Sequence, residues 1–473
     1  MLNLTNIQGN ILRGYASFPH AQFLFFEIQN ADDARAFIQR LLETNAVTPA
    51  LWRAKPDATL NIAFTFEGLR ALGLPTESLA TFPCEFQEGM KPRANELGDV
   101  DESSPEHWDD PWKTHRVHML ISIYGRTEPA LAAHCQQLRD LLPNGVQELK
   151  DSQPAGLLHI NGEQTRKEHF GFLDGLSNPA IEGVPDDGGR DRQDVGNPDD
   201  KGRFRKIPLG EFLLGHPGEG GEMAPMPLPH LLAHDGTYLV YRKLEQDVVR
   251  FRRYLDDQAD AFARTIPGPL PDGVSPQKFL AAKMMGRWQD GSSLIEHPDA
   301  PRKDTRNTFG YAGDPAGARC PLGAHVRRAN PRDAFGFDGK TMSRHRLIRR
   351  GIAYGKYLPK GAEHNPESQE KRGIIFIALN SGFDQFEFVQ QKWMNFGDDF
   401  EQGNDTDPIA GNRPTIGGRQ SAQMMIPGDE ATGRRPFICF DIPRFVTTRG
   451  GDYFFVPSLA ALGLLASGGV DVA

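Results

Sequence analysis

The sequence of 473 residues predicts an α+β fold made of two halves of similar type. Short runs rich in β-branched and aromatic residues alternate with segments whose apolar residues recur at helical spacing. This alternation occurs before residue 150 and again after residue 237. At 52.5 kDa the chain is long enough for two domains. We place the boundary between the halves near residues 150–165.

The first half predicts three strands and three helices. The strands are expected at 22–28, 60–66 and 118–124, and the helices at 32–44, 66–72 and 129–142. In the last helix Leu131, Leu138 and Leu141 can share one face. Strands with helices on one side indicate an α+β sandwich.

The second half repeats this character. Strands are expected at 237–242, 373–379 and 453–457, and helices at 248–262, 276–288, 383–393 and 459–466. Two segments, 184–202 and 403–431, are rich in Gly, Asp and Arg and predict long irregular loops.

Charge and cysteine content exclude several classes of protein. A net charge of -9 and a pI near 5.9 argue against a nucleic-acid-binding protein. The four cysteines form no CxxC pair, which argues against thiolate zinc and iron–sulfur sites and favours reduced thiols. No apolar run is long enough to span a bilayer, and the first ten residues lack the features of a signal peptide. We therefore expect a cytoplasmic protein without membrane partners.

One carboxylate, Asp174, stands between two glycines in the run from Gly171 to Gly175 (GFLDG). Large apolar side chains flank it, and burial disfavours the charged form of an acid. Glycine permits a tight turn and the close approach of a flat ligand. A simpler interpretation is a turn in which Asp174 bonds its own backbone.

Two further segments carry candidate groups. His325 follows the small residues Gly323 and Ala324, and Arg349 belongs to an arginine cluster in 345–355. Separately, each is typical of a structural histidine and a solvated basic face. Together with an acid they supply what peroxide cleavage at haem requires: a neutral imidazole for the iron, a proton carrier and a fixed cation.

These segments resemble the dye-decolourising peroxidase family. GFLDG matches the family's GxxDG motif, 323–332 (GAHVRRANPR) its proximal-histidine segment, and 348–355 (IRRGIAYG) its distal-arginine segment. Residues 6–14, 371–376 and 450–458 also agree. The resemblance extends nearly end to end and is greatest to the larger members of the family.

The resemblance implies a fold of two ferredoxin-like halves with packed antiparallel sheets, of the dimeric α+β barrel type, with helices outside. Residues 1–160 would form the N-terminal half. Residues 161–473 would form the C-terminal half, which binds haem and carries long loop insertions.

The resemblance also implies roles for individual residues. His325 would be the proximal iron ligand, Asp174 the distal acid–base and Arg349 the distal cation, with Arg350 as the alternative to Arg349. Gly351 occupies a position where some compact members have Asn, so no distal amide can come from it.

The remaining implied site residues surround the cofactor. Ile374 and Phe376 would restrict access to the distal side, while Gly171, Phe172 and Gly175 would lie against the porphyrin. Because a ligating histidine normally donates its other N–H to a carboxylate, we expect Asp407, or else Asp405, beside His325.

The implied activity is that of a peroxidase with one haem b per chain. Hydrogen peroxide would be the oxidant, and dyes, phenols or other aromatic donors would be oxidised in one-electron steps through an oxyferryl compound I. Tyr354, Tyr357 and Trp393 are candidate relays to the surface. The natural reductant, Mn(II) included, and the oligomeric state stay open. A haem-delivering protein and a haem-free binding module are the alternatives.

Overall fold

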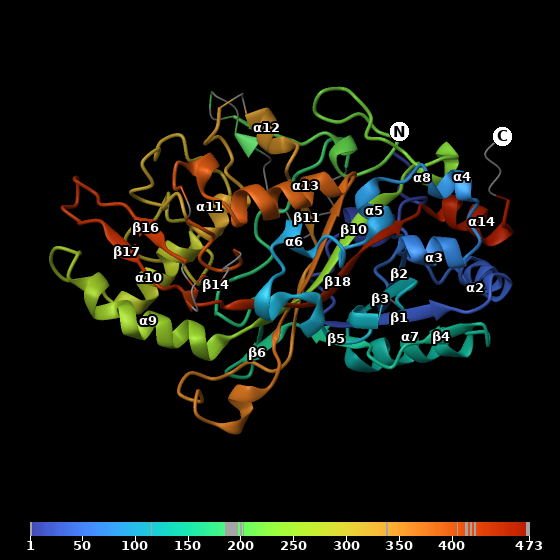
Figure 1. The fold of residues 1–473 in the computed structure, drawn as a ribbon, viewed down its shortest axis with the longest axis horizontal. Helices are drawn as coiled ribbons and strands as arrows, with labels where there is room; N and C mark the ends of the chain where they lie inside the picture. The colour runs from blue at the N-terminus through green and yellow to red at the C-terminus, as the bar shows by residue number, and fades with distance from the viewer. Residues whose placement is uncertain are drawn as a thin grey trace.

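The computed structural model describes residues 2–114, 116–184, 197–198, 201, 203–336, 339–403, 405–411, 415–416, 419–420 and 422–469. The expected loop at 184–202 lies largely outside these residues, and the loop at 403–431 partly so. The described chain is an α+β fold in which helices surround one large antiparallel sheet (Figure 1). The predicted fold class is confirmed.

Within the described residues the large sheet has ten strands, and the strands that pair are antiparallel. Its order is β11-β13-β10-β18-β2-β3-β1-β4, with β12 also beside β13 and β5 beside β1. The strands are β1 His20–Ile28, β2 Ala58–Phe64, β3 Met119–Gly125, β4 Val146–Glu148, β5 Gln153–Gly156, β10 Thr237–Gln246, β11 Ile348–Arg349, β12 Ile352–Tyr354, β13 Gly373–Asn380 and β18 Val446–Val456.

The two halves of the chain meet at the centre of this sheet. Strands β1–β5 come from the first half and β10–β13 with β18 from the second. They join where Phe455 of β18 pairs with Phe64 of β2. The division at residue 160 falls within the hairpin of β6 Leu158–Ile160 and β7 Glu163–Thr165, and it stays a prediction.

The helices pack around the sheet, and some of them extend the molecule beyond one end of it (Figure 1). They are α1 Gly9–Leu12, α2 Ala31–Glu43, α3 Phe66–Ala71, α4 Thr76–Leu79, α5 Cys84–Glu88, α6 Ala94–Leu97, α7 Glu128–Asp140, α8 His230–Ala233, α9 Val248–Ala263, α10 Pro276–Met285, α11 His325–Ala329, α12 Lys340–Ser343, α13 Phe383–Phe388 and α14 Leu459–Ser467. None of the described helices is both long and apolar enough to cross a membrane.

Short helical turns and small hairpins lie between these strands and helices. The 3₁₀ turns are η1 Asp101–Ser103, η2 Pro105–His107, η3 Trp112–Thr114, η4 Leu209–Glu211, η6 Pro366–Gln369 and η8 Asp398–Phe400, and η7 Val389–Met394 is a π-helical turn. The small hairpins besides β6–β7 are β8 Asn197–Pro198 with β9 Phe204–Arg205, β14 Thr415–Ile416 with β15 Arg419–Gln420, and β16 Met424–Ile426 with β17 Phe437–Cys439.

Each predicted strand and helix is present, with shifted ends. Strand β18 begins at Val446, well before the expected 453, and α10 ends at Met285 because Gly286 closes it at a φ of +95°. The helix expected at 383–393 divides into α13 and the π-helical η7. The segment 403–431, expected to be irregular, contains β14, β15 and β16.

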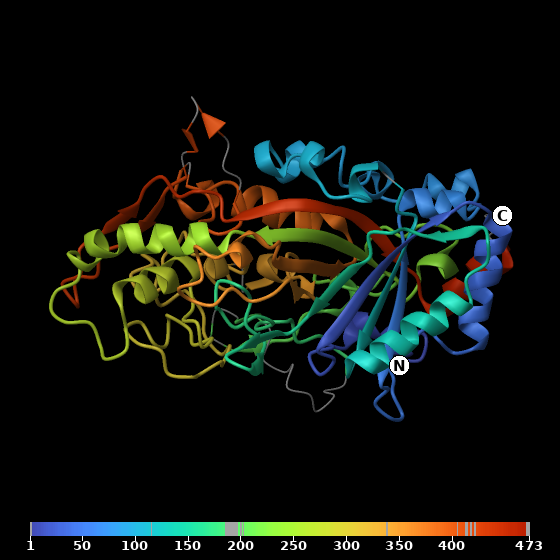
Figure 2. The same cartoon turned by 90° about the horizontal axis from the view of Figure 1, so that it is seen from below.

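Two large apolar cores follow from this arrangement. The first fills the space between the sheet and helices of both halves, α2, α13 and α14 among them. The second lies around α9 and α10, which extend from the opposite end of the molecule (Figures 1 and 2). The C-terminal helix α14 packs against α2 and α8 and so returns the end of the chain to the first half.

Gln8, in the N-terminal segment 6–14, ties both halves together. Its side chain is fully buried, and Nε2 donates to the carbonyl oxygens of Ile62 and Pro457, each at 2.9 Å. Its Oε1 accepts the N–H of Ile62 at 2.9 Å. One amide thus satisfies backbone groups within β2 and directly after β18.

We expect Gln8→Ala to lower the free energy of unfolding by about 2–4 kcal/mol, because three buried backbone groups lose their partner. Gln147→Ala, at an exposed glutamine, is the control and should change it by less than about 0.5 kcal/mol. Urea unfolding measures both values, and equal effects of the two substitutions would contradict this role of Gln8.

Candidate active site

The segments singled out in the sequence converge on one cavity of about 310 Å³. It lies between the second core and the sheet strands β10, β13 and β18, which contribute to its wall. Of the predicted site residues, the following line it: Phe172, Asp174, Gly175, His325, Arg349, Ile374 and Phe376. Asp407 does not line it but lies in contact with His325.

His325 is the first residue of the short helix α11, and its imidazole bonds to a fully buried carboxylate. Its Nδ1 lies 3.1 Å and 3.0 Å from the two carboxylate oxygens of Asp407. Asp407 Oδ1 also accepts the N–H groups of Ile409 and Ala410. The side chain of His325 is 27% exposed, and no hydrogen bond among the described residues uses Nε2. The bond to Asp407 therefore leaves Nε2 available as a ligand.

The carboxylate of Asp407 and the imidazole of His325 each shift the pKa of the other. Burial opposes the charged form of both groups, but their mutual attraction outweighs it. The pKa of Asp407 is held below its usual value and the pKa of His325 above it. Asp405, the alternative partner, does not contact His325, and burial raises the pKa of its carboxyl.

Two buried arginines after His325 hold the loops around it. Arg328 Nη1 donates to the carbonyl oxygens of Trp393 and Phe396, and its Nη2 to that of Asp405. Arg327 donates in the same way to the carbonyl oxygen of Cys320. The five N–H donors of a guanidinium suit this task. These arginines were not predicted as functional residues. Their position in the motif around His325 was the only feature of the sequence that could have indicated a role.

Asp174 and Arg349 form the second pair in the cavity. Arg349 Nη1 lies 3.6 Å from Asp174 Oδ1, and each side chain is about one-third exposed. Asp174 Oδ1 also accepts the N–H of Gly175 at 2.6 Å, so the simpler interpretation as a turn cap holds as well. Arg349 is held by Asn178 Oδ1, which accepts its N–H at 2.9 Å, and by the carbonyl oxygen of Leu176.

Arg350, the alternative cation, points elsewhere. Its Nε and Nη2 donate to the carbonyl oxygens of Asn10 and Ile11, at 2.8 Å and 3.0 Å. Adjacent strand residues face opposite sides of a sheet, and β11 ends at Arg349. The structure therefore places Arg349 rather than Arg350 beside Asp174.

Strand β13 and the π-helical turn η7 form the apolar part of the wall. Ile374 and Phe376 alternate with buried residues along β13 and face the cavity, as their spacing predicts. From η7, Val389, Gln390 and Met394 reach the same space. Such wide turns occur frequently at functional sites.

The glycines of the site serve different purposes. Gly175 lines the cavity at a φ of +75°, and a Cβ there would lie 2.4 Å from Arg166 Nη2. Gly171 does not line the cavity; its φ of +94° serves the turn itself. Gly351 lines the cavity, where a Cβ would lie 3.1 Å from the carbonyl oxygen of Ile375.

Glu168, which no sequence motif singled out, has a buried carboxylate that organises the turn bearing Asp174. Its oxygens accept the N–H groups of Phe170 and Phe172, each at 2.8 Å, and Nε2 of Gln246 at 2.6 Å. Burial raises the pKa of Glu168 to about 7, although these donors oppose the increase. The only signal in the sequence was its position just before GFLDG.

Comparison with known proteins shows which family the chain belongs to. Residues 6–155 match the family model described as the DyP dimeric alpha+beta barrel domain. Peroxidase 2 of Mycetinis scorodonius is 30% identical over 492 residues, covering 98% of this chain and 87% of that protein. A dye-decolorizing peroxidase of Mycena epipterygia is 30% identical over 503 residues, with the same coverage. Multifunctional dye peroxidase DyP2 of an Amycolatopsis species is 29% identical, covering 97% and 95%.

Solved structures extend the agreement to the whole fold. A fungal DyP-type peroxidase from Auricularia auricula-judae superposes with a TM-score of 0.79 at 26% identity, covering 98% of this chain and 99% of that one. A dye-decolorizing peroxidase in complex with 2,6-dimethoxyphenol gives 0.78 at 26% identity, covering 98% and 100%. The chain belongs to the dye-decolorizing peroxidase family. It is therefore an oxidoreductase that acts on peroxide, in a family that depends on haem.

We expect Glu168 to make stability fall as the pH rises. Its pKa is raised in the folded chain, so the folded state binds the extra proton between the unfolded value near 4.5 and about 7. Between pH 5 and pH 7 this costs about 2 kcal/mol of unfolding free energy.

Urea unfolding of the wild type and Glu168→Gln at both pH values measures this contribution. The substitution adds a constant loss, because Gln cannot accept from both N–H groups, but it removes the pH-dependent part. An equal change with pH in both proteins would refute the assignment.

Proposed function

We propose that the protein is a haem b peroxidase in which His325 binds the iron and Asp174 with Arg349 activates hydrogen peroxide. One observation carries this proposal: the His325–Asp407 and Asp174–Arg349 pairs open onto the same cavity. When bound, haem supplies the redox-active iron and stores the oxidising equivalents taken from peroxide.

The residues present fit a haem. The bond between Nδ1 and a carboxylate fixes the orientation of the His325 ring and leaves Nε2 as the nitrogen that would bind haem iron. Apolar side chains from both walls of the cavity, Phe172 from the second core and Ile374 and Phe376 from β13, suit the faces of a porphyrin. Gly175 and Gly351 also line the cavity.

Asp174 is the proton carrier in this proposal. Its carboxylate accepts a proton from one oxygen of hydrogen peroxide and returns it to the other, which leaves as water. Arg349, always charged and held by Leu176 and Asn178, stabilises the negative charge that develops on the oxygens. Ile374 and Phe376 narrow the space around these two groups, so a peroxide-sized molecule enters in preference to a bulky donor.

Aromatic compounds are the proposed electron donors. The curated relatives are named as dye-decolorizing peroxidases, and one solved neighbour holds 2,6-dimethoxyphenol. These names support phenols and dyes as the electron donors. Tyr354, Tyr357 and Trp393 do not line the cavity, so a relay role for them rests on sequence alone. A cytoplasmic location is supported by the four cysteines, each of which is a free thiol.

We expect Asp174→Asn to slow the reaction with hydrogen peroxide by about 10²–10⁴-fold, because an amide cannot accept the proton. Stopped-flow absorbance of the haem measures this rate. Asp151→Asn, at an exposed carboxylate, is the matched control and should react as the wild type does. An Asp174→Asn enzyme with the wild-type rate would show that another group carries the proton. A haem-delivering protein would bind haem yet turn over peroxide negligibly even as the wild type.

We expect His325→Ala to lose the axial nitrogen ligand, which electron paramagnetic resonance and the Soret absorbance both report. Asp407→Asn should keep the ligand but weaken haem retention by about 10–100-fold, because the imidazole loses its orienting carboxylate. Haem transfer to an acceptor protein measures retention. An unchanged axial signature in His325→Ala would place the ligand elsewhere.

A further inference from the structure

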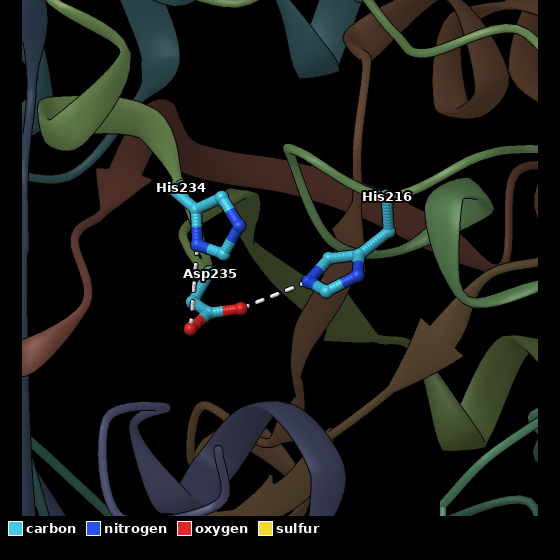
Figure 3. A group of neighbouring side chains, drawn as sticks. All are labelled: His216, His234 and Asp235. Carbon is cyan, nitrogen blue, oxygen red and sulfur yellow. Dashed lines mark hydrogen bonds and ion pairs between the residues drawn. The ribbon is translucent and has the colours of Figure 1, made fainter. Parts of the chain in front are cut away.

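Three potential metal ligands converge outside the cavity just described: His216, His234 and Asp235 (Figure 3). His216 lies in the loop after η4, and the other two lie between α8 and β10. His216 Nε2 is 2.8 Å from Asp235 Oδ1, and His234 Nδ1 is 3.4 Å from Asp235 Oδ2. The two imidazole rings are 5.3 Å apart between centroids. None of the three lines the cavity of the active site.

The backbone holds the two loops together at this point. Leu214 N–H donates to the carbonyl oxygen of Gly236 at 2.9 Å, and Asp235 N–H donates to that of Leu214 at 3.1 Å. Asp235 takes a φ of +62°, in the left-handed region that few residues other than glycine adopt. Gly215 has a φ of +83°, and a Cβ there would lie 2.8 Å from His234 Cδ2. These backbone bonds and the two left-handed residues place the three side chains near one another.

The cluster has a buried side, formed by Asp235, and a side that faces solvent, formed by the two histidines. The carboxylate of Asp235 is 5% exposed, and its Oδ2 also accepts Nδ2 of Asn6 at 2.8 Å. His216 is 20% exposed and His234 53%. The carboxylate is therefore fixed from within, while the imidazoles face outward and can be reached from solvent.

We propose that His216, His234 and Asp235 bind a divalent transition-metal ion of the Zn²⁺ type. The three ligand atoms lie within 4.8 Å of one another, and around tetrahedral zinc such atoms are about 3.3 Å apart. Side-chain movements of about 1 Å convert the hydrogen-bonded cluster into a coordination site. Three protein ligands leave a fourth position for water.

The donor set selects the class of metal. Two imidazole nitrogens and one carboxylate oxygen suit zinc, cobalt, nickel and copper, whereas calcium and magnesium prefer oxygen ligands alone. Asn6 holds the ligating carboxylate from behind, as partners of metal-bound carboxylates commonly do. Through Asn6, a bound ion would also connect the N-terminal segment to the loops around α8.

Equilibrium dialysis of the haem-loaded enzyme against Zn²⁺, with metal quantified by mass spectrometry, tests the proposal. We expect one zinc ion per chain in addition to the haem iron. His234→Ala and Asp235→Asn should each weaken zinc binding by at least about tenfold, because each removes or alters one of three ligands. Peroxide turnover of His234→Ala should match the wild type.

Two control variants separate this cluster from ordinary surface histidines. His230, exposed at the start of α8, lies outside the cluster, so His230→Ala should bind zinc as the wild type does. His297 pairs with Asp304 at 3.2 Å without a second imidazole, so His297→Ala should also leave zinc binding unchanged. Absence of bound zinc in the wild type, or zinc binding as tight in His234→Ala and Asp235→Asn as in the wild type, would overturn the proposal. Anomalous scattering at the zinc edge in soaked crystals locates the ion.

Discussion

The bond between the buried carboxylate of Asp407 and the imidazole of His325 is the interaction on which the candidate site depends. A buried charge is tolerated only when it is paired and hydrogen-bonded. Here the pairing is nearly complete, since the carboxylate also accepts the N–H groups of Ile409 and Ala410. The same bonds fix the loop around Asp407 and the orientation of the ring, so a compensated charge also aims one nitrogen into the cavity.

Buried polar side chains act elsewhere as fasteners for irregular backbone. Arg328 donates to three carbonyl oxygens of η7 and the chain that follows it, and Glu168 accepts two N–H groups from the turn that bears Asp174. Loops cannot satisfy their own backbone as helices and strands do. With 50 glycines and 36 prolines this chain has much loop to organise, and these side chains make its loops rigid enough to hold a site.

The sheet contributes the opposite wall of the cavity and shows why the halves must be joined. Strand β13 presents Ile374 and Phe376, and its neighbour β11 ends at Arg349, which reaches across to Asp174. Both strands depend on β10 and β18, and β18 pairs with β2 of the first half. The N-terminal half therefore stabilises the scaffold of a site whose main residues all come from the second half.

Local patterns in the sequence were sufficient for the α+β class and for the strands and helices, whereas the roles of the site residues are predictions from motifs that resemble a known family. The local patterns sufficed because periodicity and turn residues act over a few positions. GFLDG and the segments around His325 and Arg349 pointed to a site only when they were taken together. Only the tertiary structure showed that Arg349, not Arg350, lies beside Asp174. It also showed that Asp407, not Asp405, bonds to His325. Asp407 is 82 residues from His325, and no short-range pattern reports such a contact. The same reason applies to residues that the sequence did not single out: Glu168, Arg328 and the cluster of His216, His234 and Asp235. Each of them contacts backbone or side chains that only folding brings near.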